Sequence, residues 1–236
     1  MMIKNKFRFL YILICLIFCG CVNTYSHYIG EEYLGAKYKN NPLGEGKGID
    51  SDPLIRTDAF DCVTFVETSL AHGDVEKLTQ IRYKDGEIDF LNRNHFIELD
   101  WLANNKDIVE NVSKKYGQTA TRTVTIDKQR WLKKKFNINE NIPLQTVQIK
   151  YIPYSNLTKI RNSQPLIVLF ISGNSNFYET IGTNLAVVHM GFLLPNGKLR
   201  HASQKQGAVV DVDFYEFIEE KSKNKNNFGI ALLKIK

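Results

Sequence analysis

The sequence has no apolar run long enough to cross a membrane as a helix. The longest candidate, Phe9–Cys19, has 11 residues, whereas a bilayer core of about 30 Å needs about 20. A basic stripe with interleaved aromatic residues is also lacking. Without residues 1–20, the 31 basic residues become 28 against 25 acidic ones, so we expect no nucleic-acid partner. Closely spaced ligand pairs are missing too, and we expect no metal and no cofactor.

The N-terminus has the pattern of an export signal. Basic residues at positions 4, 6 and 8 precede the apolar run, which ends in Phe18-Cys19-Gly20-Cys21. This ending resembles the lipobox of bacterial lipoproteins, although Phe18 replaces the usual leucine. We predict a signal peptide over 1–20, a lipid on Cys21 and one domain over 21–236. The mature protein would be exported from a bacterial cell as a monomer. The lipid would be its only contact with a membrane, either on the periplasmic side or at the cell surface. Without a lipid, the protein would be secreted or periplasmic.

Cysteine is scarce in the mature chain. Cys15 and Cys19 leave with the signal and Cys21 carries the lipid, so Cys62 is the one remaining thiol. Exported proteins usually pair their cysteines in disulfides. A single unpaired thiol therefore needs a chemical explanation.

The chain is predicted to form an α+β domain, with helices first and antiparallel strands after them. Helices are expected over Glu31–Tyr38, from Cys62 to Ala71, over Asn94–Val112 and over Phe214–Lys221, and Asn40–Pro53 reads as loop. A sheet of roughly six strands is expected from the segments 122–127, 145–152, 166–171, 186–194, 198–203, 208–213 and 229–235.

Cys62 lies at the predicted start of a helix, where Asp58 and Asp61 are both plausible N-cap residues. Unpaired N–H groups and the helix dipole stabilise an anion at this position. The location therefore predicts a thiol pKa below the free value of about 8.5. The alternative is a core cysteine that packs as a small apolar residue.

A nucleophilic thiol needs a base within hydrogen-bond reach and a group that orients this base. Of the five histidines, His27 is near the new N-terminus, His72 ends the helix that Cys62 begins, and His95 lies in a polar turn where a structural role is expected. His189 and His201 remain, twelve residues apart on the two arms of a predicted hairpin.

The turn of this hairpin decides whether the two histidines share a face. A two-residue turn would place them on opposite faces, whereas the three-residue loop Pro195-Asn196-Gly197 puts His201 opposite Gly191. Proline suits the first turn position and glycine the left-handed one, so the turn favours the second register. Ser203 then lies opposite His189 and is a rival orienting group.

These motifs resemble a known superfamily. Asp61-Cys62-Val63-Thr64-Phe65 and His189-Met190-Gly191-Phe192, with Arg200-His201-Ala202-Ser203, are similar to the NlpC-type papain-like peptidases of bacterial cell walls. The longer run from Asp61 to Glu67 looks most like the N-acetylmuramoyl-L-alanine amidase-like branch. Val63-Thr64 replaces the Ser-Gly of the common endopeptidases and points to the same branch.

The resemblance implies a papain-like fold and a cysteine hydrolase of peptidoglycan or muropeptides. Cys62 would attack an amide carbonyl, His189 would move the proton, and His201 would orient His189, with Asp61 and Ser203 as supporting groups. The bond would join the muramoyl lactyl group to L-Ala. A γ-D-glutamyl-diamino acid endopeptidase, a thiol acyltransferase with the same triad and a catalytically silent wall-binding lipoprotein are the alternatives.

Overall fold

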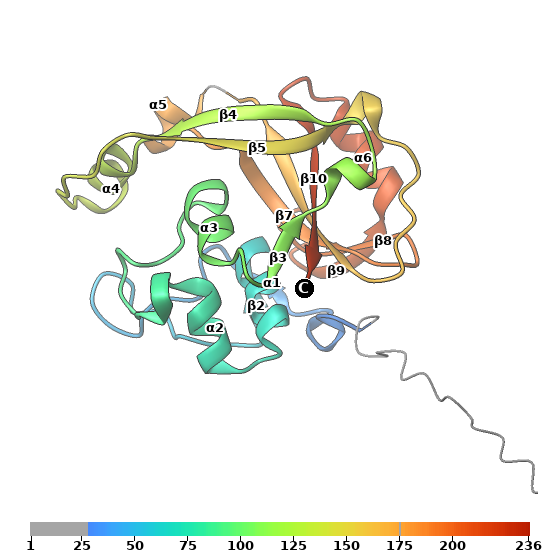
Figure 1. Cartoon of the computed structure of the whole chain (residues 1–236). Coiled ribbons are helices and arrows are strands. Elements are labelled where there is room, and N and C mark those ends of the chain that lie inside the picture. The colour runs from blue at the N-terminus through green and yellow to red at the C-terminus, as the bar shows by residue number, and fades with distance from the viewer. Residues whose placement is uncertain (1–27, 175) are drawn as a thin grey trace, which may run out of the picture.

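A computed structural model describes residues 28–174 and 176–236 (Figure 1). The predicted signal peptide and Cys21 lie outside these residues. Within the described part of the chain, no helix has both the length and the apolar character needed to cross a bilayer.

The centre of the molecule is one mixed sheet of ten strands, ordered β2-β1-β9-β8-β7-β6-β10-β5-β4, with β3 paired to β10. All pairs are antiparallel except β1 with β2. The strands are β1 (Lys37–Tyr38), β2 (Ala59–Phe60), β3 (Val109–Asn111), β4 (Ala120–Ile126), β5 (Gln145–Pro153), β6 (Leu166–Ser172), β7 (Val187–Leu193), β8 (Lys198–Ser203), β9 (Ala208–Asp213) and β10 (Asn227–Ile235). All seven predicted segments are strands. The expected count of six was too low because β1, β2 and β3 are too short to show alternation.

Six α-helices surround the sheet in the described residues. They are α1 (Cys62–Ala71), α2 (Val75–Arg82), α3 (Leu102–Asn104), α4 (Lys128–Phe136), α5 (Phe177–Ile181) and α6 (Phe214–Ser222). The predicted helices at Cys62 and Phe214 are therefore confirmed.

One predicted helix is wrong, and another is confirmed only over 97–104. Over 31–38 there is one 3-10 turn, Glu31–Tyr33, because Gly35 adopts φ +84° and donates its N–H to Val209 of β9. Over 94–112 there is a π-helix, Ile97–Trp101, followed by α3 and then β3. The segment leaves the helical path because its last residues pair with β10.

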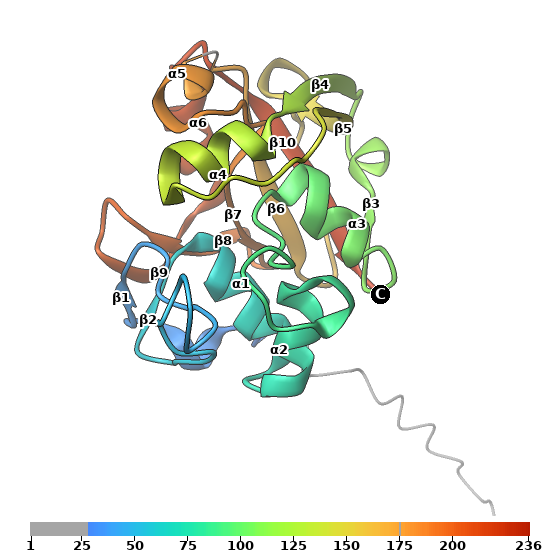
Figure 2. The ribbon, with the colours of Figure 1, turned by 90° about the vertical axis from the view of Figure 1, so that its left-hand side faces the viewer.

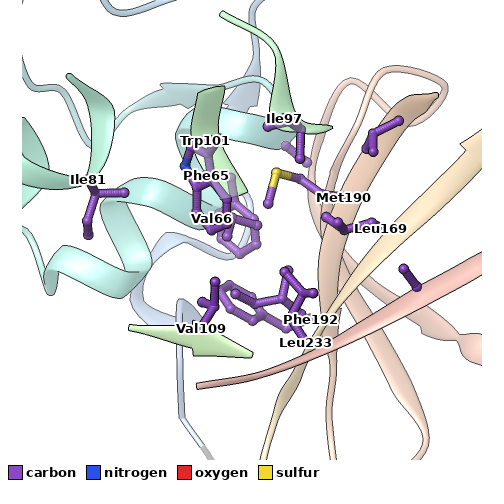
Figure 3. Close-up of a cluster of buried hydrophobic side chains, with 14 of the residues drawn as sticks. Phe65, Val66, Ile81, Ile97, Trp101, Val109, Leu169, Met190, Phe192 and Leu233 are labelled. Carbon is purple, nitrogen blue, oxygen red and sulfur yellow. The ribbon is translucent and has the colours of Figure 1, made fainter. Parts of the chain in front are cut away.

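The two faces of the sheet carry different helices. Helix α1 packs against β7 and β8, and the core on this side includes Phe65, Met190 and Phe192 (Figure 3). The core on the other side joins strand residues such as Phe170 to Phe214 of α6. Figure 2 shows α1 lying close to β7 and β8 in the turned view. The N-terminus of α1 thus points at the hairpin that carries His189 and His201.

Candidate active site

Asp61 is the residue that begins α1. Its Oδ1 accepts the N–H of Val63 at 3.1 Å and of Thr64 at 2.8 Å, and the Thr64 hydroxyl accepts the N–H of Asp61 at 3.0 Å. This reciprocal capping box fixes where the helix starts. Asp58, the other candidate cap, instead forms a bidentate pair with Arg56.

The hairpin has the register expected from its three-residue loop. Leu194 donates its N–H to the Lys198 carbonyl at 2.9 Å, and Gly197 adopts φ +80°. Phe192 pairs with Arg200. Extending this register by one residue places Gly191 opposite His201. The structure therefore confirms this register and excludes the two-residue turn.

The strands β7 and β8 stop pairing with each other beyond the Phe192–Arg200 pair and leave an opening there. Beyond this point β7 still pairs with β6, and β8 still pairs with β9. Gly191 lies at the start of this opening, where a Cβ atom would stand 2.7 Å from the Arg200 carbonyl oxygen. The next N–H, that of Met190, faces the sulfur of Cys62 instead of a β8 carbonyl. The thiol thus lies at an opening between two strands.

His189 and His201 are hydrogen-bonded to each other across this opening. Nε2 of His189 lies 2.8 Å from Nδ1 of His201, and the rings are nearly perpendicular at 82°. Phe217 of α6 packs against both rings. Ser203 does not take part, since its hydroxyl accepts the N–H of Gln206 at 3.2 Å. The structure therefore places His201, and not Ser203, against His189.

Cys62 and His189 line one pocket of about 130 Å³. His189 pairs across the sheet with Phe170, so its imidazole projects to the face that α6 covers, whereas the sulfur approaches from the α1 side. Among the described residues, no hydrogen bond joins Cys62 to His189, and Nδ1 of His189 accepts none. This nitrogen is available to take a proton.

The thiol is protonated in this arrangement. Burial raises the pKa of Cys62 to about 12, and the Asp61 carboxylate adds to the shift, while the N–H groups of Met190, Cys62 and Val63 oppose it. The expectation of a lowered thiol pKa is therefore wrong for this state. The helix end cannot compensate for burial because Asp61 already occupies its N–H groups with a negative charge.

The histidines are neutral for the same reason. Burial lowers the pKa of His189 to about 3, with help from His201 and Lys221. Burial also lowers the pKa of His201 to about 4, and Lys221 again contributes. A neutral thiol therefore faces a neutral imidazole pair.

Tyr38 is a site residue that the sequence reasoning missed. Burial, together with negative charge on Cys62 and Asp61, raises the pKa of its phenol to about 12. Tyr38 lies opposite Phe60, two residues before Cys62, and its phenol keeps its proton at neutral pH. Its sequence neighbours Lys37 and Lys39 form no motif that could have pointed to it.

Glu98 and His95 also line the small pocket. Glu98 Oε1 accepts the N–H of Ala186 at 2.5 Å, the N–H of Val187 also acts on this carboxyl group, and Oε2 is buried without a partner in the described chain. Burial raises the pKa of this carboxyl. His95 has the structural role that was expected, since its Nε2 bonds to the Phe90 carbonyl at 2.7 Å.

A larger pocket of about 500 Å³ adjoins the histidine pair on the α6 side. His189 lines both pockets, and the larger one also includes His201, Tyr154, Phe217 and Lys221. Within the described residues, no cluster of three or more histidine, cysteine, aspartate or glutamate side chains could hold a metal ion.

The chain is similar to known proteins over most of its length. The family model described as N-acetylmuramoyl-L-alanine amidase-like (AmiA-like) matches residues 28–228. A Legionella pneumophila protein of the DUF1460 family model is 24% identical with a TM-score of 0.81, covering 90% of this chain and 88% of the other. An N-acetylmuramoyl-L-alanine amidase from Bacteroides uniformis is 23% identical with a TM-score of 0.70, covering 90% and 98%. No curated protein matches the sequence.

Proposed function

Because the chain belongs to the N-acetylmuramoyl-L-alanine amidase-like family, we propose that it is a thiol-dependent amidase of papain-like design. Its substrate is the amide between the muramoyl lactyl group and L-Ala, in peptidoglycan or in muropeptides. One observation carries this assignment: a helix-start thiol stands at an opening between two strands, beside a hydrogen-bonded pair of histidines.

In the proposed mechanism, each of the three residues has one role. The Cys62 thiol gives its proton to Nδ1 of His189 as the sulfur bonds to the amide carbonyl carbon. The His189 imidazolium then protonates the leaving amine, the C–N bond breaks and a thioester remains. Water, deprotonated by His189, hydrolyses this thioester. His201 binds Nε2 of His189 and so leaves Nδ1 as the nitrogen that can take the thiol proton.

Two donors support the oxyanion of the tetrahedral intermediate. The N–H of Cys62 is at the start of α1, where it has no helical partner. The Tyr38 phenol lies near the sulfur and, with a pKa of about 12, remains a hydrogen-bond donor at neutral pH. These donors stabilise the charge that develops on the carbonyl oxygen.

The small pocket favours the lactyl–alanine bond over a γ-D-glutamyl bond. About 130 Å³ of space is bounded mainly by apolar side chains, among them Val63, Phe96 and Leu185. A lactyl–alanine amide carries a methyl group on each side of the scissile bond, and such a group fits this volume. A γ-D-glutamyl bond to a diamino acid has a long polar side chain on the amine side.

The two remaining enzyme classes make different products. An endopeptidase shortens the stem peptide, and an acyltransferase with the same residues passes the acyl group to an amine or alcohol in place of water. Mass spectrometry of purified muropeptides after incubation separates these outcomes. We expect free N-acetylmuramic acid-containing glycan plus intact stem peptide.

The variants Cys62→Ala and His189→Ala are expected to lose this activity while the fold persists, as judged by an unchanged circular dichroism spectrum. Wild-type turnover by Cys62→Ala would overturn the mechanism. Unchanged muropeptides with the wild-type protein would instead support the wall-binding alternative.

Cell-wall amidases act outside the cytoplasm, and the family therefore agrees with the predicted export signal over 1–20. The proposal includes a lipid on Cys21 that anchors the enzyme at a membrane surface. Labelling with a radioactive fatty acid tests this step, and Cys21→Ser is expected to remove the label.

A further inference from the structure

Lys221 lies at the end of α6 beside the histidine pair. Its ammonium nitrogen stands 5.0 Å from the centre of the Phe217 ring, and this ring packs 5.1 Å from that of His201. Lys221, His189 and His201 all line the pocket of about 500 Å³. The Lys221 ammonium therefore lies in the same pocket as the histidine pair, and this pocket is larger than the one that Cys62 lines.

The carboxylates of this pocket are engaged elsewhere or lie at its exposed rim. Glu220 pairs with Lys205 at 2.9 Å. Asp213 accepts the first N–H groups of α6, and Glu216 is exposed. Among the described residues, no carboxylate lies within ion-pair distance of Lys221. The lysine is half-buried. The pKa of the neighbouring Glu220 is lowered by its pair with Lys205, and the charge of Lys221 contributes to this shift.

This charge opposes the proposed reaction. The Lys221 ammonium helps to lower the pKa of both imidazoles, yet His189 must become an imidazolium when it takes the thiol proton. A positive charge close to a developing positive charge raises the energy of that step. An anion bound at Lys221 would cancel the penalty.

We infer that the pocket of about 500 Å³ is a carboxylate subsite in which Lys221 binds a free carboxylate of the substrate's stem peptide. The inference rests on the proposed amidase function and adds a substrate class to it. The α-carboxylate of a γ-linked glutamate, two residues from the scissile bond, has the required chemistry. Binding it places a negative charge beside the histidine pair only when the substrate is present, so an acidic substrate promotes its own cleavage.

The test compares two muropeptides that differ in one group: N-acetylmuramoyl-L-Ala-γ-D-Glu-L-Lys with the α-carboxylate of the glutamate free, and the same compound with this α-carboxylate amidated to isoglutamine. For the wild-type enzyme we expect kcat/KM to be about ten- to a hundredfold higher with the free carboxylate. Lys221→Gln should abolish this preference, and Lys221→Arg should keep most of it. Lys223→Gln is the matched control, because Lys223 is exposed on the same helix end and faces Glu219 at 3.7 Å.

An unchanged preference in Lys221→Gln, or equal rates of the wild-type enzyme on both muropeptides, would overturn the inference. A second measurement does not depend on turnover. In Cys62→Ala, the acidic muropeptide should raise the pKa of His189 and His201 as followed by nuclear magnetic resonance, and the added change Lys221→Gln should remove this shift. If Cys62→Ala itself hydrolyses the substrate, the proposed function fails, whatever the result at Lys221.

Discussion

His189 and His201 are joined by a 2.8 Å hydrogen bond across two strands that no longer pair at that point. Each histidine is held by its other neighbour: His189 lies opposite Phe170 of β6, and His201 lies opposite Val210 of β9. The imidazole contact therefore spans an opening whose two edges are fixed independently. His189 can therefore keep its position even though β7 and β8 do not pair next to the Cys62 sulfur.

Replacing His201 should weaken catalysis without abolishing it. His201→Ala removes the group that holds Nε2 of His189, and we expect kcat to fall about ten- to a hundredfold, with a small change in KM. His201→Asn, which can still bond to Nε2, should recover part of the loss. Ser203→Ala is the control and should retain full activity, because this hydroxyl serves Gln206. A Ser203→Ala loss as large as that of His201→Ala would contradict the assignment.

Glu98 is expected to act through the backbone of β7. In Glu98→Gln the amide oxygen still accepts the N–H groups of Ala186 and Val187, so activity should stay within about threefold of wild type. Glu98→Leu leaves both buried N–H groups without an acceptor, at a cost of about 1–3 kcal/mol each. Glu98→Leu should lower both the melting temperature and kcat, because Val187 is the first residue of β7, the strand that carries His189. Equal effects of the two substitutions on kcat would refute this role.

The sequence predicted the local geometry around the candidate site better than its electrostatic state. Three features were readable because each depends on local chemistry: a helix that starts at Cys62 behind an aspartate cap, with Asp58 and Asp61 both open, the turn at Gly197 and the register that follows from it. The thiol pKa was not readable. It depends on burial by residues far apart in the chain, and the sign of that effect opposes the helix end.

The missed residues have the same physical explanation. Tyr38 lies near Cys62 because β1 pairs with β2, which places Tyr38 opposite Phe60, and these two strands have only two residues each. Glu98 lies in a π-helix that apolar spacing could not distinguish from an ordinary helix. Non-local pairing and irregular helices leave no periodic pattern in a single sequence.

Three buried histidines should make the protein sensitive to acid. The pKa is lowered to about 3 for His95 and His189 and to about 4 for His201, whereas the unfolded chain takes up these protons near pH 6.5. Between these values the unfolded state binds more protons, so the free energy of unfolding falls as the pH decreases from about 6.5 to about 4, by up to about 1.4 kcal/mol per pH unit for each histidine.

Urea unfolding at several pH values measures this slope. His95→Gln keeps an N–H donor for the Phe90 carbonyl and removes one titrating group, so the slope of stability against pH should fall by the contribution of one histidine. The exposed His72→Gln serves as the control. A stability that is constant from pH 7 to pH 4.5 would show that these side chains are not neutral in the folded state.

Cys62 should react slowly with iodoacetamide at neutral pH. Only the thiolate is alkylated, and a pKa of about 12 leaves very little of it at pH 7. The rate, followed by mass spectrometry of the intact protein, should rise about tenfold per pH unit from 7 to 10 without a plateau. A fast reaction that is independent of pH between 5 and 8 would reveal a preformed thiolate–imidazolium pair.

Asp61→Asn separates the charge of the cap from its hydrogen bonds. Asparagine is as good an N-cap as aspartate, so its side-chain oxygen can still accept the N–H groups of Val63 and Thr64. The amide nitrogen takes the place of Oδ2, which accepts the N–H of Asn41 at 3.0 Å, so this one bond is lost and the melting temperature should fall slightly. Removing the negative charge next to the sulfur lowers the thiol pKa, and alkylation at pH 8 should become faster by about threefold or more. Slower alkylation of Asp61→Asn would mean that the carboxylate assists thiolate formation, which reverses the sign of the interaction seen here.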